Sequence, residues 1–212
     1  MANMDYDKMA RILVRCGEIG TASDMKAIVK TTYSGVLQPK AEAFVLAYRL
    51  AVKAESTWAT EGFEAQLAIA SFDKPFREAR SVVMAFVPTV IVPATLKQLN
   101  TDTDRLQAIK DLVSIVDEHK GLAWADELLG GDFGQNAEAT KSEMLGAISA
   151  SSALDKARKA RATTFDPAYE AYLRFKRVVK DALGATSTEY KRIHVRAPAA
   201  NEIEAEPPSV PT

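Results

Sequence analysis

Cysteine is nearly missing from this sequence. Cys16 is the only cysteine among 212 residues, so the chain cannot form an internal disulfide or a zinc site built from cysteines. Residues 1–7 lack the basic start and apolar core of a signal peptide. The longest apolar run, 82–93, is interrupted by Pro88 and is too short to span a bilayer. These absences predict a soluble protein of a reducing, cytoplasmic compartment that does not contact membranes.

Catalytic and metal-binding motifs are missing as well. The sequence has no Gly-x-Ser-x-Gly motif, no zinc-protease motif and no Cys–His pairing, and its two histidines are too few for the usual metal site. Asp132-Phe133-Gly134 matches the metal-binding triplet of protein kinases, but no glycine-rich loop or His-Arg-Asp sequence accompanies it, so we interpret it as a turn between helices. We therefore expect no enzyme, no catalytic residue, no cofactor and no metal. A small-molecule site between bundle helices, which leaves no motif, is the alternative.

No stretch alternates between apolar and polar residues for long enough to predict a strand. Apolar residues instead recur with helical spacing along most of the chain, which predicts an all-α protein, a multi-helix bundle. Glycine, proline and capping residues set the expected boundaries. The expected helices are 5–17, 23–33, 39–56, 63–72, 73–86, 102–120, 122–129, a long helix from 135, 165–183 and 187–195.

The stretch 35–56 contains an almost unbroken apolar run. Apolar residues surround the expected helix and leave a thin polar seam of Glu42, Arg49 and Lys53. Pro39 suits the first turn of a helix, where its missing N–H costs no hydrogen bond. We expect this helix to be central and to be buried on most of its circumference.

One stretch of the first half has no helical pattern. Val90, Ile91 and Val92 lie between Pro88 and Pro93, and both β-branched residues and prolines favour extended backbone. We expect a linker that is buried against the bundle, because soluble chains rarely leave such apolar residues exposed. The alternative is an exposed apolar docking loop.

The second half of the chain repeats features of the first at offsets between 92 and 97 residues. These offsets predict two tandem pseudo-symmetric units of about five helices each, 1–100 and 101–196. The first third of each half matches poorly, and the alternative is that unrelated helices look alike because helices begin with similar residues. The repeated features are Gly35, Leu37, Gln38 and Ala41-Glu42-Ala43 with Gly131, Phe133, Gln135 and Ala137-Glu138-Ala139, then Ala51, Ala54 and Ser56 with Ala147, Ala150 and Ser152, and finally Phe72-Asp73-Lys74-Pro75 with Phe165-Asp166-Pro167.

The net charge of −1 conceals a segregation of charge along the chain. Residues 101–139 carry 3 basic and 9 acidic residues, whereas 140–196 carry 12 and 6. Residues 197–212 hold three glutamates and four prolines, which predicts a disordered acidic tail. The basic residues of the second block are candidate contacts for phosphates or for a partner, and the alternative is a solvated outer face of bundle helices. They are Arg158, Lys159, Arg161, Arg174, Arg177, Lys180, Lys191, Arg192 and Arg196.

These features favour a non-enzymatic structural protein that works through self-association or protein–protein contacts. Its partner is then a second copy of the chain or another protein, and the basic block and Val90, Ile91 and Val92 are its contact surfaces. Opposite charges on one chain suit head-to-tail association, in which the acidic region of one copy meets the basic region of the next. The alternative is a nucleic-acid-associated helical protein that binds the phosphate backbone through the basic region 156–196.

Overall fold

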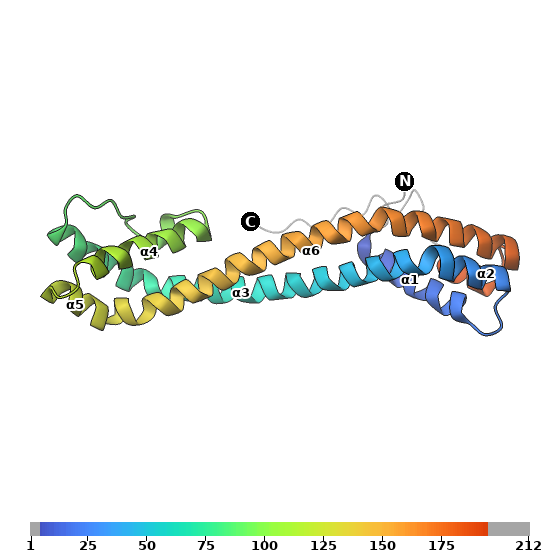
Figure 1. Ribbon diagram of the computed structural model, residues 1–212, viewed down its shortest axis with the longest axis horizontal. Coiled ribbons are helices and arrows are strands. Elements are labelled where there is room, and N and C mark those ends of the chain that lie inside the picture. The colour runs from blue at the N-terminus through green and yellow to red at the C-terminus, as the bar shows by residue number, and fades with distance from the viewer. Residues whose placement is uncertain (1–4, 195–212) are drawn as a thin grey trace, which may run out of the picture. The chain divides into compact units, whose positions relative to one another are not determined.

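The computed structural model describes residues 5–194 of the chain. Every regular element in this part of the chain is a helix, so the predicted all-α class is confirmed (Figure 1). The predicted tail, 197–212, lies outside the described residues. The helices are α1 (Tyr6–Thr21), α2 (Ala27–Thr32), the π-helix η1 (Tyr33–Leu37), α3 (Gln38–Phe86), the 3₁₀-helix η2 (Leu96–Gln98), α4 (Asp102–Glu118), α5 (Ala123–Gly130), α6 (Asp132–Leu183) and α7 (Thr188–Ile193).

Helix α1 begins after a capping residue, Asp5. The carboxylate of Asp5 accepts a hydrogen bond of 2.6 Å from the amide N–H of Lys8, which satisfies one of the free donors of the first turn. Gly17 and Gly20, at which the sequence predicts the end of this helix, both lie inside it, because it continues to Thr21. Gly20 has a packing role instead: a Cβ atom there would lie 2.1 Å from Cγ of Tyr33. The missing side chain lets the aromatic ring pack directly on the helix.

The predicted helix end at Ser34-Gly35 is also wrong. Helix α2, η1 and α3 follow one another without a gap, so the chain is helical from Ala27 to Phe86. The π-helical turn accommodates one more residue per turn than an α-helix does. It keeps both Tyr33 and Leu37 buried on the same side as the core. Burial therefore overrides the local preference of Ser34-Gly35 for a turn.

Helices α3 and α6 each run through a proline. The sequence predicted new helices at Pro75 and Pro167 and a break at 60–62, and all three expectations are wrong. A proline inside a helix removes a hydrogen bond and costs about 3 kcal/mol. Phe72 and Phe76, on either side of Pro75, are fully buried, and each such side chain contributes about 1.5–3 kcal/mol. Their burial offsets the cost of the proline.

The first part of α3 is not buried on most of its circumference, contrary to the prediction. Leu46, Leu50 and Val52 are 60%, 52% and 45% exposed. Only one face of the helix meets other described residues, so the apolar residues on the opposite face remain in contact with solvent. The buried face consists of Ala41, Phe44, Ala47 and Ala51.

The described residues form two compact units, each with its own core. Unit 1 holds the described chain up to Leu50 and from Arg158 on, and unit 2 is Ala51–Ala157. Each unit therefore combines residues from both halves of the sequence, because α3 and α6 each contribute to both. The units do not follow the boundary predicted near residue 100, and the repeat of 1–100 and 101–196 stays a prediction about the sequence.

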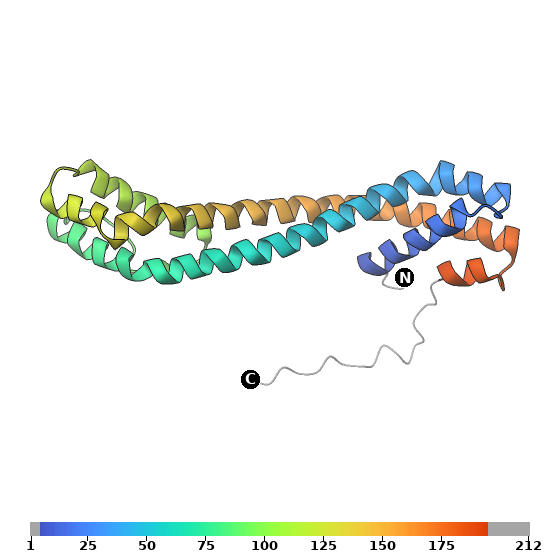
Figure 2. The ribbon, with the colours of Figure 1, turned by 90° about the horizontal axis from the view of Figure 1, so that it is seen from below.

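The core of unit 1 lies between α1, the first part of α3 and the last part of α6, and Figure 2 shows α1 beside α7. The ring of Phe44 lies 6.3 Å from that of Tyr6 and 5.7 Å from that of Phe165, measured between centroids. The buried hydroxyl of Tyr172 donates a hydrogen bond of 2.6 Å to the carbonyl oxygen of Ile193. This bond fastens the end of α7 to α6.

The core of unit 2 lies between the last part of α3, α4, α5 and the first part of α6. Phe72 of α3 stacks on Phe133 of α6 with ring centroids 5.7 Å apart. The triplet that begins with Asp132 lies in the first turn of α6, directly after α5. A Cβ atom on Gly134 would lie 2.0 Å from the carbonyl oxygen of Leu129, so the close approach of these two helices requires glycine.

Asp73 lies inside α3 instead of starting the expected helix 73–86, and its side chain binds a distant part of the chain. Its side chain is buried, and its carboxylate accepts a hydrogen bond of 3.0 Å from the amide N–H of Leu96 and another from the hydroxyl of Thr95. It also pairs with Arg77 one turn later, at 3.2 Å. The aspartate thereby ties η2 to α3.

Candidate interaction surfaces

The structure places most of the predicted basic contact residues on the surface of α6. Arg161 differs from the others, because it is partly buried and its guanidinium lies 4.4 Å from the ring centroid of Tyr6. Arg196 lies outside the described residues. The exposed residues of the set are Arg158, Lys159, Arg174, Arg177 and Lys180 on α6, and Lys191 and Arg192 on α7.

A basic groove lies between α1 and α7 in unit 1. Lys8, Arg11 and Arg15 are exposed on one face of α1, at spacings of three and four residues, and Arg192 and His194 line the other side. The groove has a volume of about 480 Å³ and is also lined by Asp5, Ile12 and Ile193. The sequence analysis identified Arg192 and missed the three residues of α1. Their helical spacing was the available signal.

Two of the four Lys and Arg side chains in this groove have acidic partners. Arg11 pairs with Asp7, and Arg192 pairs with Glu18. Arg15 donates a hydrogen bond of 3.3 Å to the carbonyl oxygen of Arg192, which is a neutral partner. Neither Arg15 nor Lys8 has an acidic partner among residues 5–194. The groove therefore keeps a positive charge.

An acidic stripe runs along α4 in unit 2. Asp104, Asp111 and Glu118 are exposed and lie seven residues apart, which places them on one face of the helix. Their carboxylates accept hydrogen bonds only from neutral side chains of the same helix or its cap, and none has a basic partner among the described residues 5–194. The donors are Thr101, Gln107 and Ser114.

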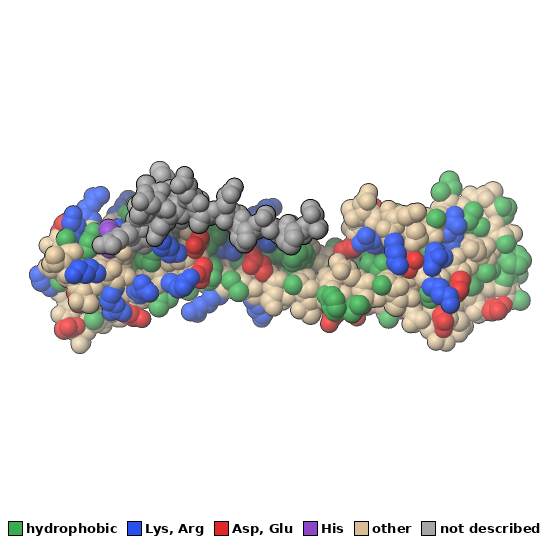
Figure 3. Space-filling model, turned by 180° about the vertical axis from the view of Figure 1, so that it is seen from behind, with side chains coloured by type: hydrophobic (Ala, Val, Ile, Leu, Met, Phe, Trp, Pro, Cys, Tyr) green, Lys and Arg blue, Asp and Glu red, His purple; other side chains and the backbone are tan. Residues whose placement is uncertain are grey.

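Helix α3 has an exposed apolar face in unit 2 that is formed by Phe63 and Leu67, whereas the exposed Trp58 lies on a different side of the helix. None of the residues 52–64 is buried, although the segment contains several large apolar side chains. Trp58 is 46% exposed, Phe63 is 61% exposed and Leu67, one turn later, is 54% exposed. Figure 3 shows hydrophobic side chains reaching the surface among the charged ones. Soluble monomers rarely leave contiguous apolar patches on their surface, so this face is a candidate contact.

A second apolar surface in unit 2 surrounds Phe86. The ring of Phe86 stacks on Trp124 with centroids 5.2 Å apart, and His119 lies 5.3 Å from the same tryptophan ring. A cavity of about 550 Å³ begins beside this stack and is lined by acidic as well as apolar side chains. The acidic residues are Glu78, Glu127 and Asp132.

The residues of the predicted connector differ in their exposure. Ile91 is 98% exposed, Val92 is 6% exposed and Val90 is partly buried against the core of unit 2. The carbonyl oxygen of Val92 accepts a hydrogen bond of 3.0 Å from Nε of Arg80, which holds the connector to α3. The segment is thus an attached linker in which one apolar side chain points into solvent. Its role in docking stays a prediction.

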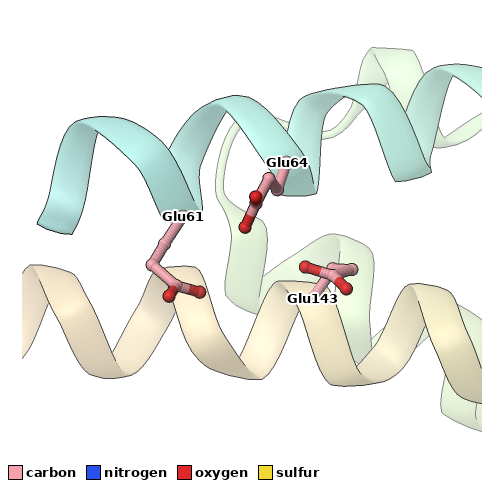
Figure 4. A group of neighbouring side chains, drawn as sticks. All are labelled: Glu61, Glu64 and Glu143. Carbon is pink, nitrogen blue, oxygen red and sulfur yellow. The ribbon is translucent and has the colours of Figure 1, made fainter.

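Three glutamates of unit 2 come together between α3 and α6. Figure 4 shows Glu61 and Glu64 on α3 and Glu143 on α6, and one carboxylate oxygen of each lies within 4.8 Å of the others. Gly146 makes room for this arrangement, because a Cβ atom there would lie 2.5 Å from Oε2 of Glu61. Carboxylates at this separation suit a hard divalent cation such as Ca²⁺. The two partly buried members and the exposed Glu64 supply too few ligands for a complete site by themselves.

Burial shifts the pKa of three side chains in the described residues. Burial raises the pKa of the Cys16 thiol to about 12, so this cysteine stays protonated and unreactive at neutral pH. Burial also raises the pKa of Tyr33, with a smaller contribution from the charge of Glu42. Burial lowers the pKa of Lys176, and the neighbouring Lys180 lowers it further.

Comparison with known proteins does not assign this chain to a family. No family model, curated protein or solved structure matches it. Among residues 5–194, none of the helices has a stretch that is both long and apolar enough to span a bilayer. The surfaces described above are therefore the basis for a functional proposal.

Proposed function

We propose that this protein is a non-enzymatic assembly protein that self-associates through exposed helix faces in a reducing, cytoplasmic compartment. The observation that supports it is the exposed pair Phe63 and Leu67, which share one face of α3. A helix of a globular protein normally buries its apolar face, whereas Phe63 and Leu67 are 61% and 54% exposed. Contact with a second copy of the chain removes these side chains from water.

Burial of this pair contributes to association. Burying a Phe or Leu side chain contributes about 1.5–3 kcal/mol, and aromatic residues are enriched at the centres of protein interfaces. Phe63 and Leu67 are four residues apart and lie side by side on the helix surface. The pair is therefore the anchor that we assign to the contact.

We also propose that the chain arose by internal duplication. The first residues of α1 and α4, Tyr6 and Asp102, are 96 positions apart, and so are those of α2 and α5. The caps Asp5 and Thr101 have the same offset, and each accepts a hydrogen bond from the amide three residues later. Buried residues at this offset are Ala10 and Leu106, Ile12 and Ala108, Leu13 and Ile109, Cys16 and Leu112, Gly20 and Val116, Val29 and Ala125, Leu37 and Phe133, Ala41 and Ala137, Phe44 and Thr140, and Ala51 and Ala147.

The offset changes once, inside the long helices. Beyond the prolines the buried residues correspond at 92 positions, so the second copy is four residues shorter, which is close to one helical turn. Such a deletion rotates the helix by only about 40° and keeps its buried face. The corresponding buried residues here are Phe76 and Ala168, Ala79 and Ala171, and Val83 and Phe175.

Reversing the polarity of the apolar face of α3 tests the assembly proposal. We expect the wild type to have a weight-average mass above that of the monomer, and the double variant Phe63→Glu with Leu67→Glu to have the mass of the monomer. The reason is that a charged side chain cannot be buried at low cost. Sedimentation equilibrium over a range of protein concentrations measures this mass. Ile28→Glu, at a 57% exposed position of α2, is the matched control and leaves association unchanged. A wild-type protein that stays monomeric at all concentrations contradicts the proposal.

Nucleic-acid binding is the second candidate function, and the basic groove of α1 and α7 favours it. Lys8 and Arg15, which have no acidic partner among residues 5–194, suit phosphate groups. This function predicts a ratio of absorbance at 260 and 280 nm that is raised in the purified protein. It also predicts an affinity for an oligonucleotide that falls steeply with salt.

A further inference from the structure

We propose that the basic groove of α1 in one copy of the protein binds the acidic stripe of α4 in a second copy. The proposal rests on the self-association proposed above and names the surfaces that select the partner. The groove provides Lys8, Arg11 and Arg15. The stripe provides Asp104 and Asp111, with Glu118 one heptad further along.

The two surfaces have the same spacing. On α1 the basic residues follow one another at three and four positions. On α4 the exposed residues Asp104, Gln107 and Asp111 have the same spacing. At the offset of 96 these residues occupy corresponding positions in the two helices, so corresponding faces carry opposite charges.

Four of the charged side chains on the two surfaces, Lys8, Arg15, Asp104 and Asp111, have no oppositely charged partner among residues 5–194. Asp104 and Asp111 accept hydrogen bonds only from Thr101 and Gln107, which are neutral. Lys8 and Arg15 have no acidic partner among the described residues 5–194. An ion pair formed between two copies therefore does not require breaking one within a copy.

An antiparallel arrangement of the two helices gives each of these four charges a partner. It places Lys8 opposite Asp111 and Arg15 opposite Asp104, and Gln107 then accepts a hydrogen bond from Arg11. The antiparallel helix dipoles also attract each other. Every copy carries both surfaces, so a second copy is the occupant with matching charge and matching spacing. The mass of the product distinguishes a reciprocal dimer from a head-to-tail chain.

Charge reversal in two separate variants tests this pairing. The first variant is Lys8→Glu with Arg15→Glu, and the second is Asp104→Lys with Asp111→Lys. At 50 mM salt we expect each variant alone to associate about tenfold more weakly than the wild type, because exposed pairs are individually weak and reversal adds repulsion. An equimolar mixture of the two variants recovers association, since each reversed face meets its complement. A chain with all four substitutions also recovers it.

The measurement is sedimentation velocity at 50 and 300 mM salt, with circular dichroism to show that each variant is folded. Association of the wild type weakens at the higher salt, because the Debye length falls. Lys40→Glu with Arg49→Glu makes the same change of charge at two exposed positions of α3 and serves as the control. We expect the control to associate like the wild type.

The outcomes separate this inference from the proposed function. Folded variants that associate like the wild type overturn the α1–α4 contact and leave self-association intact. Variants that fail to recover in the mixture overturn it too, because repulsion alone then explains the loss. A monomeric wild type overturns the proposed function itself.

Discussion

Two aspartates at corresponding places in the sequence have different surroundings. Asp73 and Asp166 each lie shortly before a proline inside a long helix. Asp73 is 4% exposed and its carboxylate binds the amide of Leu96. Asp166 is exposed and has no hydrogen bond or ion pair among residues 5–194. Their contributions to stability therefore differ although their local sequences are alike.

Alanine substitution at each aspartate tests this difference. We expect Asp73→Ala to lower the free energy of unfolding by about 1–3 kcal/mol, because the buried amide of Leu96 loses its acceptor. Asp166→Ala changes it by no more than about 0.5 kcal/mol, as is usual for an exposed position. Urea denaturation followed by circular dichroism measures both values. Equal effects at the two positions contradict the assignment.

At the scale of the element, the prolines of α3 and α6 lie inside helices, where each removes one backbone hydrogen bond. Pro167 is exposed inside α6, so its ring contributes little packing that offsets the missing hydrogen bond. Pro75 is partly buried and lines the cavity next to Phe86. Pro167 is the better place to measure the cost of a proline in these helices.

We expect Pro167→Ala to raise the free energy of unfolding by about 1–3 kcal/mol, because alanine restores the helical hydrogen bond. The gain is reduced because alanine leaves the unfolded chain more flexible. Urea denaturation measures it, and Pro88→Ala in the turn after α3 is the control without a helical bond to restore. An unchanged value for Pro167→Ala indicates that the helix is interrupted there in solution.

At the scale of the molecule, two cores share two continuous helices. Helix α3 passes from unit 1 to unit 2 between Leu50 and Ala51, without glycine or proline at that point. Helix α6 passes back between Ala157 and Arg158. When one unit unfolds, the parts of α3 and α6 that belong to the other unit lose the helical hydrogen bonds at their ends. This coupling favours a single cooperative unfolding transition.

The positions of the tryptophans make this cooperativity measurable. Trp58 and Trp124, the only tryptophans of the sequence, both lie in unit 2, whereas circular dichroism reports all helices. We expect both signals to have the same urea midpoint. Gly20→Ala, which forces a Cβ atom against Tyr33 in unit 1, lowers both midpoints together. A tryptophan midpoint that stays constant while the helical signal shifts shows that the units unfold independently.

Much of the basic groove could not be predicted from the sequence. Arg192 stood out because it belongs to a basic block, whereas Lys8, Arg11 and Arg15 lie at the other end of the chain among acidic residues. Folding brings them together: the hydrogen bond from Arg15 to Arg192 joins residues 177 positions apart. Only a tertiary contact places such groups in one groove.

The sequence by itself determined the all-helical class and several helix faces. Five apolar residues of α4 have the spacing of an inward face: Leu106, Ile109, Leu112 and Val116 are buried and Val113 is partly buried, because apolar periodicity directly reflects which face of a helix meets the core. Thr101 and Asp5 cap their helices through side chains three residues from the amide they bind, so this part of the fold is local.

Only the tertiary structure decided where helices continue and which apolar faces are covered. Local rules placed breaks at Ser34-Gly35 and before Pro75, but burial of Leu37, Phe72 and Phe76 is worth more than those preferences and keeps the chain helical. The apolar pattern of 35–56 would be the same whether the helix had neighbours on one face or on all faces. The number of neighbouring helices therefore determines how many of its faces are buried. That number is set by packing between distant segments, which periodicity within one helix does not contain.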